Sequence, residues 1–138
     1  MNVMNQLRCF LTGIRDYVFP KIPLQRLRVG EDGSIECFGG GRKHWVLRSD
    51  SDVYTVRYKY FVKHPNVRGG RFSVTAPPSH YHLVQTETLS VISGVLGYML
   101  DGVVRTAGPG ETVTFKPFHT HGFWAEDSSG EDLLFDLT

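Results

Sequence analysis

The residues of this 138-residue chain that could do chemistry lie mainly in one stretch, PPSHYHLVQTETLSVISG. His80 and His82 are two residues apart, so on an extended strand both imidazoles leave the same face and can share one ion. Tyr81, between them, then points the other way. Glu87 would have the wrong parity on an uninterrupted strand, but a bend at residues 85–86 would start a new strand and return its carboxylate to the same side.

A fourth ligand has to come from another part of the chain, and FKPFHTHGFW offers His119 and His121. Both lie on one face if the strand has begun at His119, so His119 is either a fifth ligand or a substitute for His121. Imidazole and carboxylate favour one divalent transition metal (Fe, Mn, Ni, Co, Cu or Zn), whereas Ca and Mg prefer oxygen ligands alone. Glu87 is also the candidate catalytic base. His44 and His64 are interpreted as surface or hydrogen-bonded residues.

From residue 21 onward, short apolar runs alternate with turn residues, which is typical of an all-β domain. An EDG turn at residues 31–33 predicts a hairpin. The expected strands span residues 24–29, 34–38, 44–48, 53–61, 67–75, 80–85, 88–92, 95–100, 103–105, 112–116, 119–126 and 131–137. Short strands in this number bury their apolar faces in a sandwich or a closed barrel, so we expect one β-barrel domain over residues 21–138.

The first twenty residues have a different pattern, with apolar residues at helical spacing: Val3, Leu7, Phe10, Leu11, Ile14 and Val18. They predict an amphipathic helix over residues 1–20 that packs on its own domain or on a partner subunit. Charges interrupt any apolar stretch of signal-peptide length, and the polar face has too few Lys and Arg residues for a membrane surface.

The end of the sequence adds to the expectation of a partner subunit. Only one strand is expected after the last histidine, so the barrel is open at one end or completed by a second subunit. With the amphipathic helix, this predicts a homodimer with the apolar residues of the last strand near its interface: Leu133, Leu134, Phe135 and Leu137.

Composition limits the partners and the compartment. Fifteen Lys and Arg residues against fourteen Asp and Glu residues leave a net charge of +1, too small for nucleic acid or an anionic membrane to be expected as a partner. The hydrophobic fraction of 41% is that of an ordinary globular domain. Cys9 and Cys37 lack CxxC spacing, which favours free thiols in a reducing compartment, so a cytoplasmic protein is expected.

The spacing His80-x-His82-x4-Glu87-x6-Gly94 resembles the first conserved motif of the cupin superfamily. GETVTFKPFHTH, which ends at His121, is similar to the second. The two motifs fall near residues 80–94 and 110–125. The resemblance implies a jelly-roll β-barrel with a metal site of three histidines and one glutamate, in which His121 rather than His119 completes the set.

Three positions depart from the residues that the family usually has. Val74 and Phe118 stand where glycines are common, and Ala125 stands where an Asn often follows the last histidine. None of the three is a ligand in the family. The departures therefore affect turn geometry and substrate contacts rather than the ion.

Strand parity extends the site into a substrate pocket. If Glu87 faces inward, Leu89 and Val91 do as well, and Phe123 does so with His121. The far wall is expected to come from one or more of five aromatic residues, and the strand register decides which of them face inward: Tyr58, Tyr60, Phe72, Tyr98 or Phe115. With His119 at its edge, such an apolar pocket beside one ion fits a small aromatic or otherwise lipophilic molecule that carries an oxygen atom.

The leading functional hypothesis is a metal-dependent enzyme acting on a small oxygenated substrate, aromatic or polyketide-like. An oxygenase, an isomerase or cyclase, and a decarboxylase all agree with such a site. The resemblance to small single-barrel cupins is compatible with microbial or fungal secondary metabolism. The alternative is a non-catalytic small-molecule-binding protein with a structural metal. An open coordination position separates the two, because catalytic sites keep one and structural sites are closed.

Overall fold

The computed structural model describes residues 27 and 29–138 and shows an all-β protein with three short 3-10 segments. The helix expected over residues 1–20 lies outside the described residues. The strands are β1 Ile35–Cys37, β2 Arg42–Ser49, β3 Tyr54–Tyr60, β4 Glu87–Ser93, β5 Leu96–Leu100, β6 Val103–Ala107, β7 Thr112–Phe115, β8 His121–Ala125 and β9 Leu133–Leu137. The 3-10 segments are η1 Phe38–Gly40, η2 Gly70–Phe72 and η3 Asp127–Ser129.

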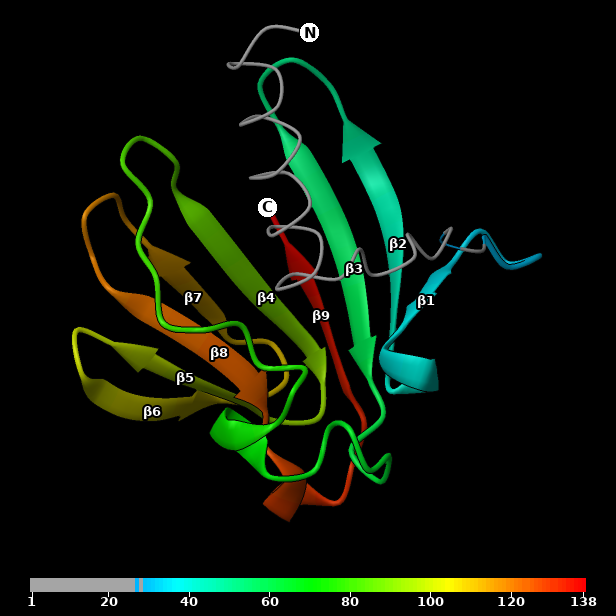
Figure 1. Cartoon of the computed structure of the whole chain (residues 1–138). Helices are drawn as coiled ribbons and strands as arrows, with labels where there is room; N and C mark the ends of the chain where they lie inside the picture. The colour runs from blue at the N-terminus through cyan, green and yellow to red at the C-terminus, as the bar shows by residue number, and fades with distance from the viewer. Residues whose placement is uncertain (1–26, 28) are drawn as a thin grey trace, which may run out of the picture.

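The strands form two antiparallel sheets that face each other (Figure 1). The larger sheet has the order β1-β2-β3-β9-β4-β7, and the smaller has the order β6-β5-β8. In Figure 1 the smaller sheet lies toward the β4 and β7 side, and β1, β2 and β3 extend away from it. The expected jelly-roll arrangement is confirmed, since strands distant in sequence alternate between the two layers.

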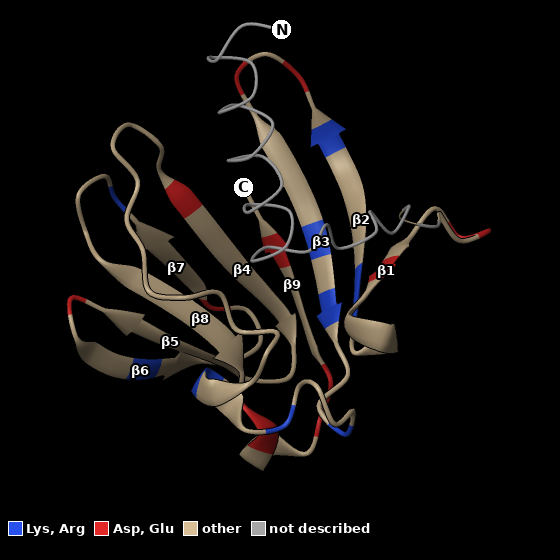
Figure 2. Cartoon of the chain, in the orientation of Figure 1, with Lys and Arg blue, Asp and Glu red and all other residues tan. Residues whose placement is uncertain are grey.

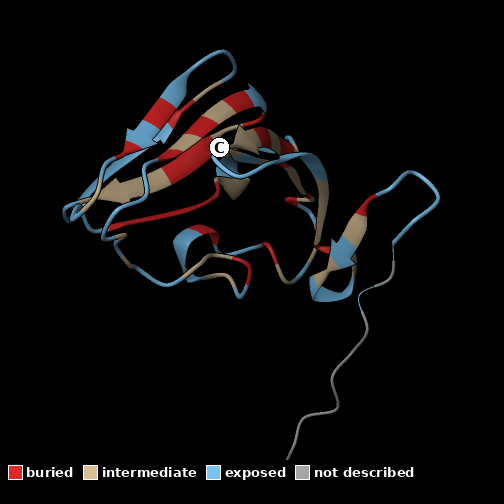
Figure 3. Ribbon diagram, turned by 90° about the horizontal axis from the view of Figure 1, so that it is seen from above, coloured by how far each residue is buried: buried red, intermediate tan, exposed pale blue. Residues whose placement is uncertain are grey.

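Alternation along the strands of the larger sheet places one set of side chains in the core. Val56 pairs with Leu137, which in turn pairs with Leu89, and Leu89 pairs with Val113. All except the partly buried Leu137 are at most 9% exposed. Figure 3 shows these buried positions alternating with exposed ones along the strands. Successive side chains of a strand point to opposite faces, so the residues two positions away share this interior.

The expected strand over residues 67–75 is wrong. Gly69 and Gly70 have φ of 99° and 55°, which an extended strand does not allow, and the chain turns into η2 instead. Phe72 is 82% exposed and does not line the interior, contrary to the sequence interpretation. The segment is therefore a loop rather than a strand, with Val67 buried in the core and Phe72 outside it.

The expected strand over residues 80–85 is also wrong, because only His80 makes a β-bridge. At the start of the described chain, Val29 forms a single bridge to Ile35, and the EDG turn lies between them as expected. The rest of the expected strand 24–29, apart from residue 27, lies outside the described residues.

The last described strand lies inside the larger sheet. β9 pairs with β3 on one side and with β4 on the other. Leu133 and Phe135 are fully buried in the core, whereas Leu134 and Leu137 are partly buried. Leu133 and Phe135 therefore do not lie at a subunit interface, and the expected homodimer stays a prediction. Within the part of the chain that the structure describes, no helix has the length and hydropathy to cross a membrane.

A substitution of Gly97 on β5 tests the packing of β5 against β8. A Cβ atom at this position would lie 2.0 Å from Nε1 of Trp124, the residue opposite it on β8. We expect Gly97→Ala to lower the free energy of unfolding by about 1–3 kcal/mol, because overpacking forces the indole to move. Urea denaturation monitored by fluorescence measures the change.

Gly108→Ala is the matched control, because its nearest contact would be 3.7 Å away, at the carboxylate end of Glu111. We expect it to be neutral or slightly stabilising. Equal urea midpoints for the two variants would contradict the packing of Trp124 against β5.

Candidate metal centre

Four side chains converge at one end of the interior, namely His80, His82, Glu87 and His121. One ligand atom from each lies within 4.8 Å of those of the other three. The imidazole centroids of His80 and His121 are 4.5 Å apart, and that of His82 is 5.2 Å from His121. The structure therefore brings together the four residues that the sequence motifs single out.

Backbone hydrogen bonds fix how the two motifs meet. The His80 N–H donates to the His121 carbonyl at 2.9 Å, and the His121 N–H donates to the His80 carbonyl at 2.8 Å. The Phe118 N–H donates to the His82 carbonyl at 2.8 Å. Phe118 has φ of 67°, the left-handed conformation that explains why the family usually has glycine there. The loop that carries His80 and His82 is thus held against the start of β8.

Glu87 reaches the site because it is the first residue of β4. The chain bends at Leu83 and Val84, two residues earlier than expected, and the new strand then presents the carboxylate inward. Glu87 is 7% exposed and His121 is fully buried. The expected change of parity between the histidine pair and the glutamate is confirmed.

Carbonyl groups orient two of the imidazoles. Nδ1 of His121 lies 2.9 Å from the His119 carbonyl oxygen, and Nδ1 of His80 lies 2.8 Å from the Pro78 carbonyl oxygen. Since a carbonyl only accepts, Nδ1 carries the proton in each ring, and this leaves the Nε2 lone pair for the site. Such an outer hydrogen bond is the usual support of a metal-bound histidine.

The arrangement leaves the centre with too many acceptors. Nε2 of His121 faces Oε2 of Glu87 at 3.0 Å, although both are acceptors in this tautomer. Nε2 of His82 is buried, has no hydrogen-bond partner and lies 3.8 Å from the same Oε2. A buried carboxylate beside unpartnered nitrogen lone pairs requires a cation or an added proton. A divalent transition metal held by His80, His82, Glu87 and His121 fits this donor set.

Phe115 supports the site from β7. It pairs with Glu87 across the sheet, and its ring stacks on the His121 imidazole with centroids 4.3 Å apart and planes 9° apart. The sequence reasoning placed Phe115 in the far wall and missed this contact with a ligand. The only sequence signal for it was its place inside the second motif, at the end of the expected strand 112–116.

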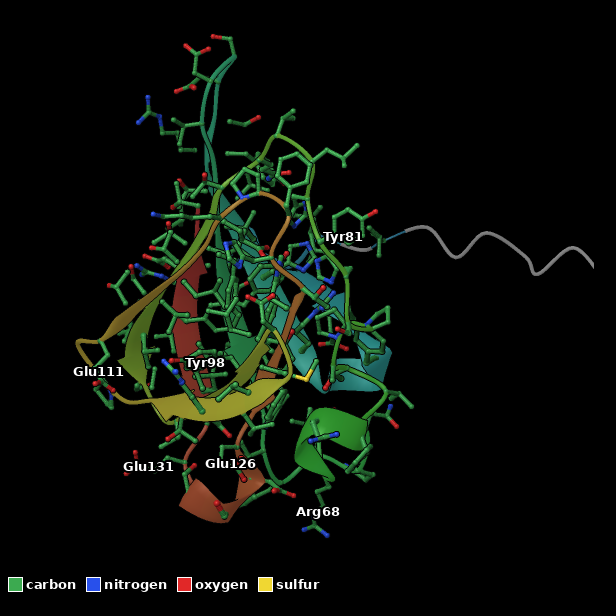
Figure 4. All side chains as sticks on the ribbon, turned by 90° about the vertical axis from the view of Figure 1, so that its left-hand side faces the viewer. Arg68, Tyr81, Tyr98, Glu111, Glu126 and Glu131 are labelled. Carbon is green, nitrogen blue, oxygen red and sulfur yellow. The ribbon has the colours of Figure 1, made fainter. Side chains whose placement is uncertain are left out.

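His119 and Tyr81 lie outside the cluster. Nδ1 of His119 is 2.6 Å from Oδ2 of Asp101, and both side chains are about half exposed. The hydrogen bond from His119 lowers the pKa of Asp101, while the carbonyl of His119 serves His121. Figure 4 shows Tyr81 at the outside of the molecule, as its place between two inward histidines requires. The structure thus uses His119 as a support of the turn between β5 and β6.

The other residues assigned to the pocket belong to the core. Leu89, Val91 and Phe123 are at most 7% exposed, and Tyr98 packs against them with its ring 6.1 Å from that of Phe115. Their inward parity is confirmed by this burial. Their contact with a substrate stays a prediction.

His44 and His64 lie away from the four-residue cluster, as expected. Nε2 of His64 is 3.1 Å from the Gly39 carbonyl oxygen, and the His44 ring lies 5.5 Å from that of Tyr58.

Comparison with known proteins identifies the same fold. Residues 73–134 match the cupin domain family. The solved structure of KdgF from Halomonas sp. superposes with a TM-score of 0.58 at 18% identity and covers 82% of this chain and 91% of its own. An RmlC-like cupin from Shewanella frigidimarina has a TM-score of 0.56 at 21% identity, with 82% and 88% covered.

Two curated relatives are named as oxidoreductases. One from Pestalotiopsis fici is 44% identical over 65% of this chain and 43% of its own length. A probable oxidoreductase from Hypocrea virens is 32% identical over 66% of this chain and 41% of its own length. The chain spans less than half the length of these two relatives. The matched region, the two-sheet fold and the position of the two motifs lead to one conclusion: the chain has a cupin-type fold, in which residues 73–134 match the cupin domain family.

Proposed function

We propose that this protein is a metal-dependent oxidoreductase that acts on a small oxygenated organic molecule, aromatic or polyketide-like. The observation that carries the proposal is the buried carboxylate of Glu87, whose Oε2 lies 3.0 Å from Nε2 of His121 and 3.8 Å from the unpartnered Nε2 of His82. A divalent metal bound there would supply Lewis acidity or redox chemistry to an oxygen atom of the substrate. The oxidoreductase names of the relatives support an oxygenase over an isomerase, a cyclase or a decarboxylase.

The chain's own residues would contribute in two ways. Oε2 of Glu87 faces the histidines, so Oε1 is the carboxylate oxygen left to accept a proton from a substrate hydroxyl or enol. The apolar core below Glu87, formed by Leu89, Val91 and Phe123, would exclude water from the reacting groups. We further propose a role in microbial or fungal secondary metabolism, as a cytoplasmic homodimer.

Removing a ligand should remove the metal. Wild-type protein is expected to hold about one equivalent of transition metal per chain, as a single four-ligand site does. His82→Ala should lose most of it, because only three of the four ligands remain. Elemental analysis after gel filtration gives the ratio.

His119→Ala is the control for this test, because His119 is a histidine of the same segment that pairs with Asp101 instead. It should keep the wild-type metal content. If His82→Ala kept as much metal as His119→Ala, the site assignment would be wrong.

Acid should release the ion while the fold persists. Imidazole binds a metal only in its neutral form, so lowering the pH through the histidine range to about pH 4 should empty the site. Dialysis at a series of pH values followed by elemental analysis measures the release, and circular dichroism monitors the fold. Full occupancy in a folded protein at the lowest pH would argue against histidine ligands.

Turnover tests the catalytic proposal. Protein loaded with Fe(II), Mn(II) or Zn(II) is incubated with phenols, enols and keto acids, with and without dioxygen, and the products are separated by mass spectrometry. We expect a metal-dependent product that His121→Ala does not form and His119→Ala does. A loaded protein with no exchangeable water at the metal and no product would instead favour the binding protein with a structural metal.

A further inference from the structure

Arg42 on β2 is a partly buried cation with no carboxylate partner among the described residues. Nε of its guanidinium is inaccessible to water and has no hydrogen-bond partner. The contact of Nη1 with the Tyr60 hydroxyl is long, at 3.5 Å. Burial of a charge without a partner is costly, and an arginine cannot lose its proton to avoid the cost. The unpartnered Nε–H points to an acceptor that the described residues do not supply.

Other cations of the larger sheet and its turns have carboxylate partners. Figure 2 shows acidic and basic residues side by side on β3 and β9. The pairs are Lys43–Asp32, Arg48–Asp50, Arg57–Asp136 and Lys59–Asp132. Among the residues that the structure describes, Arg42 has no such ion pair. Arg42 therefore differs from the other four cations of these strands, each of which forms an ion pair within the protein.

The phenols around Arg42 do not neutralise it. Burial raises the pKa of Tyr60, and burial likewise raises the pKa of Tyr58, in both cases despite the opposing effect of Arg42. Both hydroxyls therefore stay protonated and uncharged at neutral pH. They surround the guanidinium as neutral groups, so the positive charge remains available to a ligand.

Aromatic rings hold the guanidinium in place. Its central carbon lies 4.8 Å from the Phe38 ring centroid and 5.2 Å from that of Tyr58. Phe38 has φ of 55°, a conformation that is unfavourable for a bulky residue, and in it the ring covers Arg42. Ring faces stabilise a cation but accept no conventional N–H hydrogen bond, so the Nε–H stays unsatisfied. The guanidinium edge that carries this Nε–H matches the two oxygen atoms of a carboxylate.

Arg42 faces the same interior as the metal centre. It pairs with Tyr60, and two residues further along β2 His44 pairs with Tyr58, whose ring stacks on Phe135 of the core. Tyr58 also lies within electrostatic reach of both charges, because Arg42 lowers its pKa and Glu87 raises it, each less than burial does. The Tyr58 ring thus contacts both the guanidinium and the core residue Phe135. In Figure 1 this part of the larger sheet extends beyond the smaller one.

We infer that Arg42 binds a carboxylate of an elongated aromatic acid whose oxygenated far end reaches the metal centre. The inference rests on the proposed function and narrows the substrate class to acids. Tyr58 and Phe38 would flank the ligand, and Glu87 would lie at its far end.

Binding of 4-hydroxycinnamate and of the neutral 4-hydroxycinnamyl alcohol to zinc-loaded protein tests the inference, with calorimetry as the readout. Wild type should bind the acid more tightly than the alcohol. Arg42→Met keeps the aliphatic part of the side chain. It should lower the affinity for the acid by about tenfold or more, since a charge-assisted hydrogen bond contributes about 1.5–3 kcal/mol. Binding of the alcohol should change by less than about twofold in Arg42→Met.

Lys43→Met is the matched control. It removes one positive charge from the neighbouring residue of β2, which points to the opposite face of the sheet. Both ligands should keep their wild-type affinity in this variant. If Lys43→Met and Arg42→Met lowered the affinity for the acid equally, the loss of any positive charge on β2 would explain the effect. That result would overturn the inference.

Further outcomes separate this inference from the proposed function. No preference of wild type for the acid, or an equal loss for acid and alcohol in Arg42→Met, would overturn the carboxylate site while leaving the metal centre untouched. If Arg42→Met does not fold, Arg42→Lys serves, because an ammonium keeps the charge but loses the planar pair of donors. Arg42→Lys should lower the affinity for the acid severalfold and leave the affinity for the alcohol unchanged. Arg42-dependent binding by a wild type that holds no metal would contradict the proposed function alone.

Discussion

A carboxylate oxygen of Glu87 and an imidazole nitrogen of His121 face each other across 3.0 Å inside the barrel, and both residues are closed off from water. Nδ1 of the same imidazole is already committed to a carbonyl, so neither facing atom has a proton to give. Like acceptors at this distance repel, and burial strengthens the repulsion because the dielectric constant is low. The surrounding residues hold these two side chains in place. The backbones of His80 and His121 are hydrogen-bonded to each other, and the ring of Phe115 stacks on the His121 imidazole.

The chemistry of the site follows from short-range sequence patterns, and for that reason it was predictable. Spacing of two residues fixes the common face of His80 and His82, and alternation fixes the inward direction of Glu87. Family resemblance decided between His119 and His121, which strand parity alone could not do. The structure shows why parity failed, since His119 precedes β8 and pairs with Asp101 in a turn.

Long-range contacts and loop conformations were not predictable from the same patterns. Residues 67–75 have the composition of a strand, yet Gly69 and Gly70 take left-handed conformations that no periodicity reveals. Arg42 was not singled out at all, because its significance depends on which residues fail to lie beside it. The absence of a partner is a property of the folded chain rather than of a spacing.

The place of β9 has a consequence for how the chain folds. β9 follows every other described strand in sequence, but it separates β3 from β4 in the larger sheet. Until the ribosome has released this segment, β3 and β4 each expose an edge with unpaired N–H and C=O groups, and the two halves of the sheet cannot join. Such pairing between distant segments makes folding slow and exposes open edges to aggregation during synthesis. The Arg and Lys side chains of β3 disfavour pairing of that edge with another chain until β9 arrives.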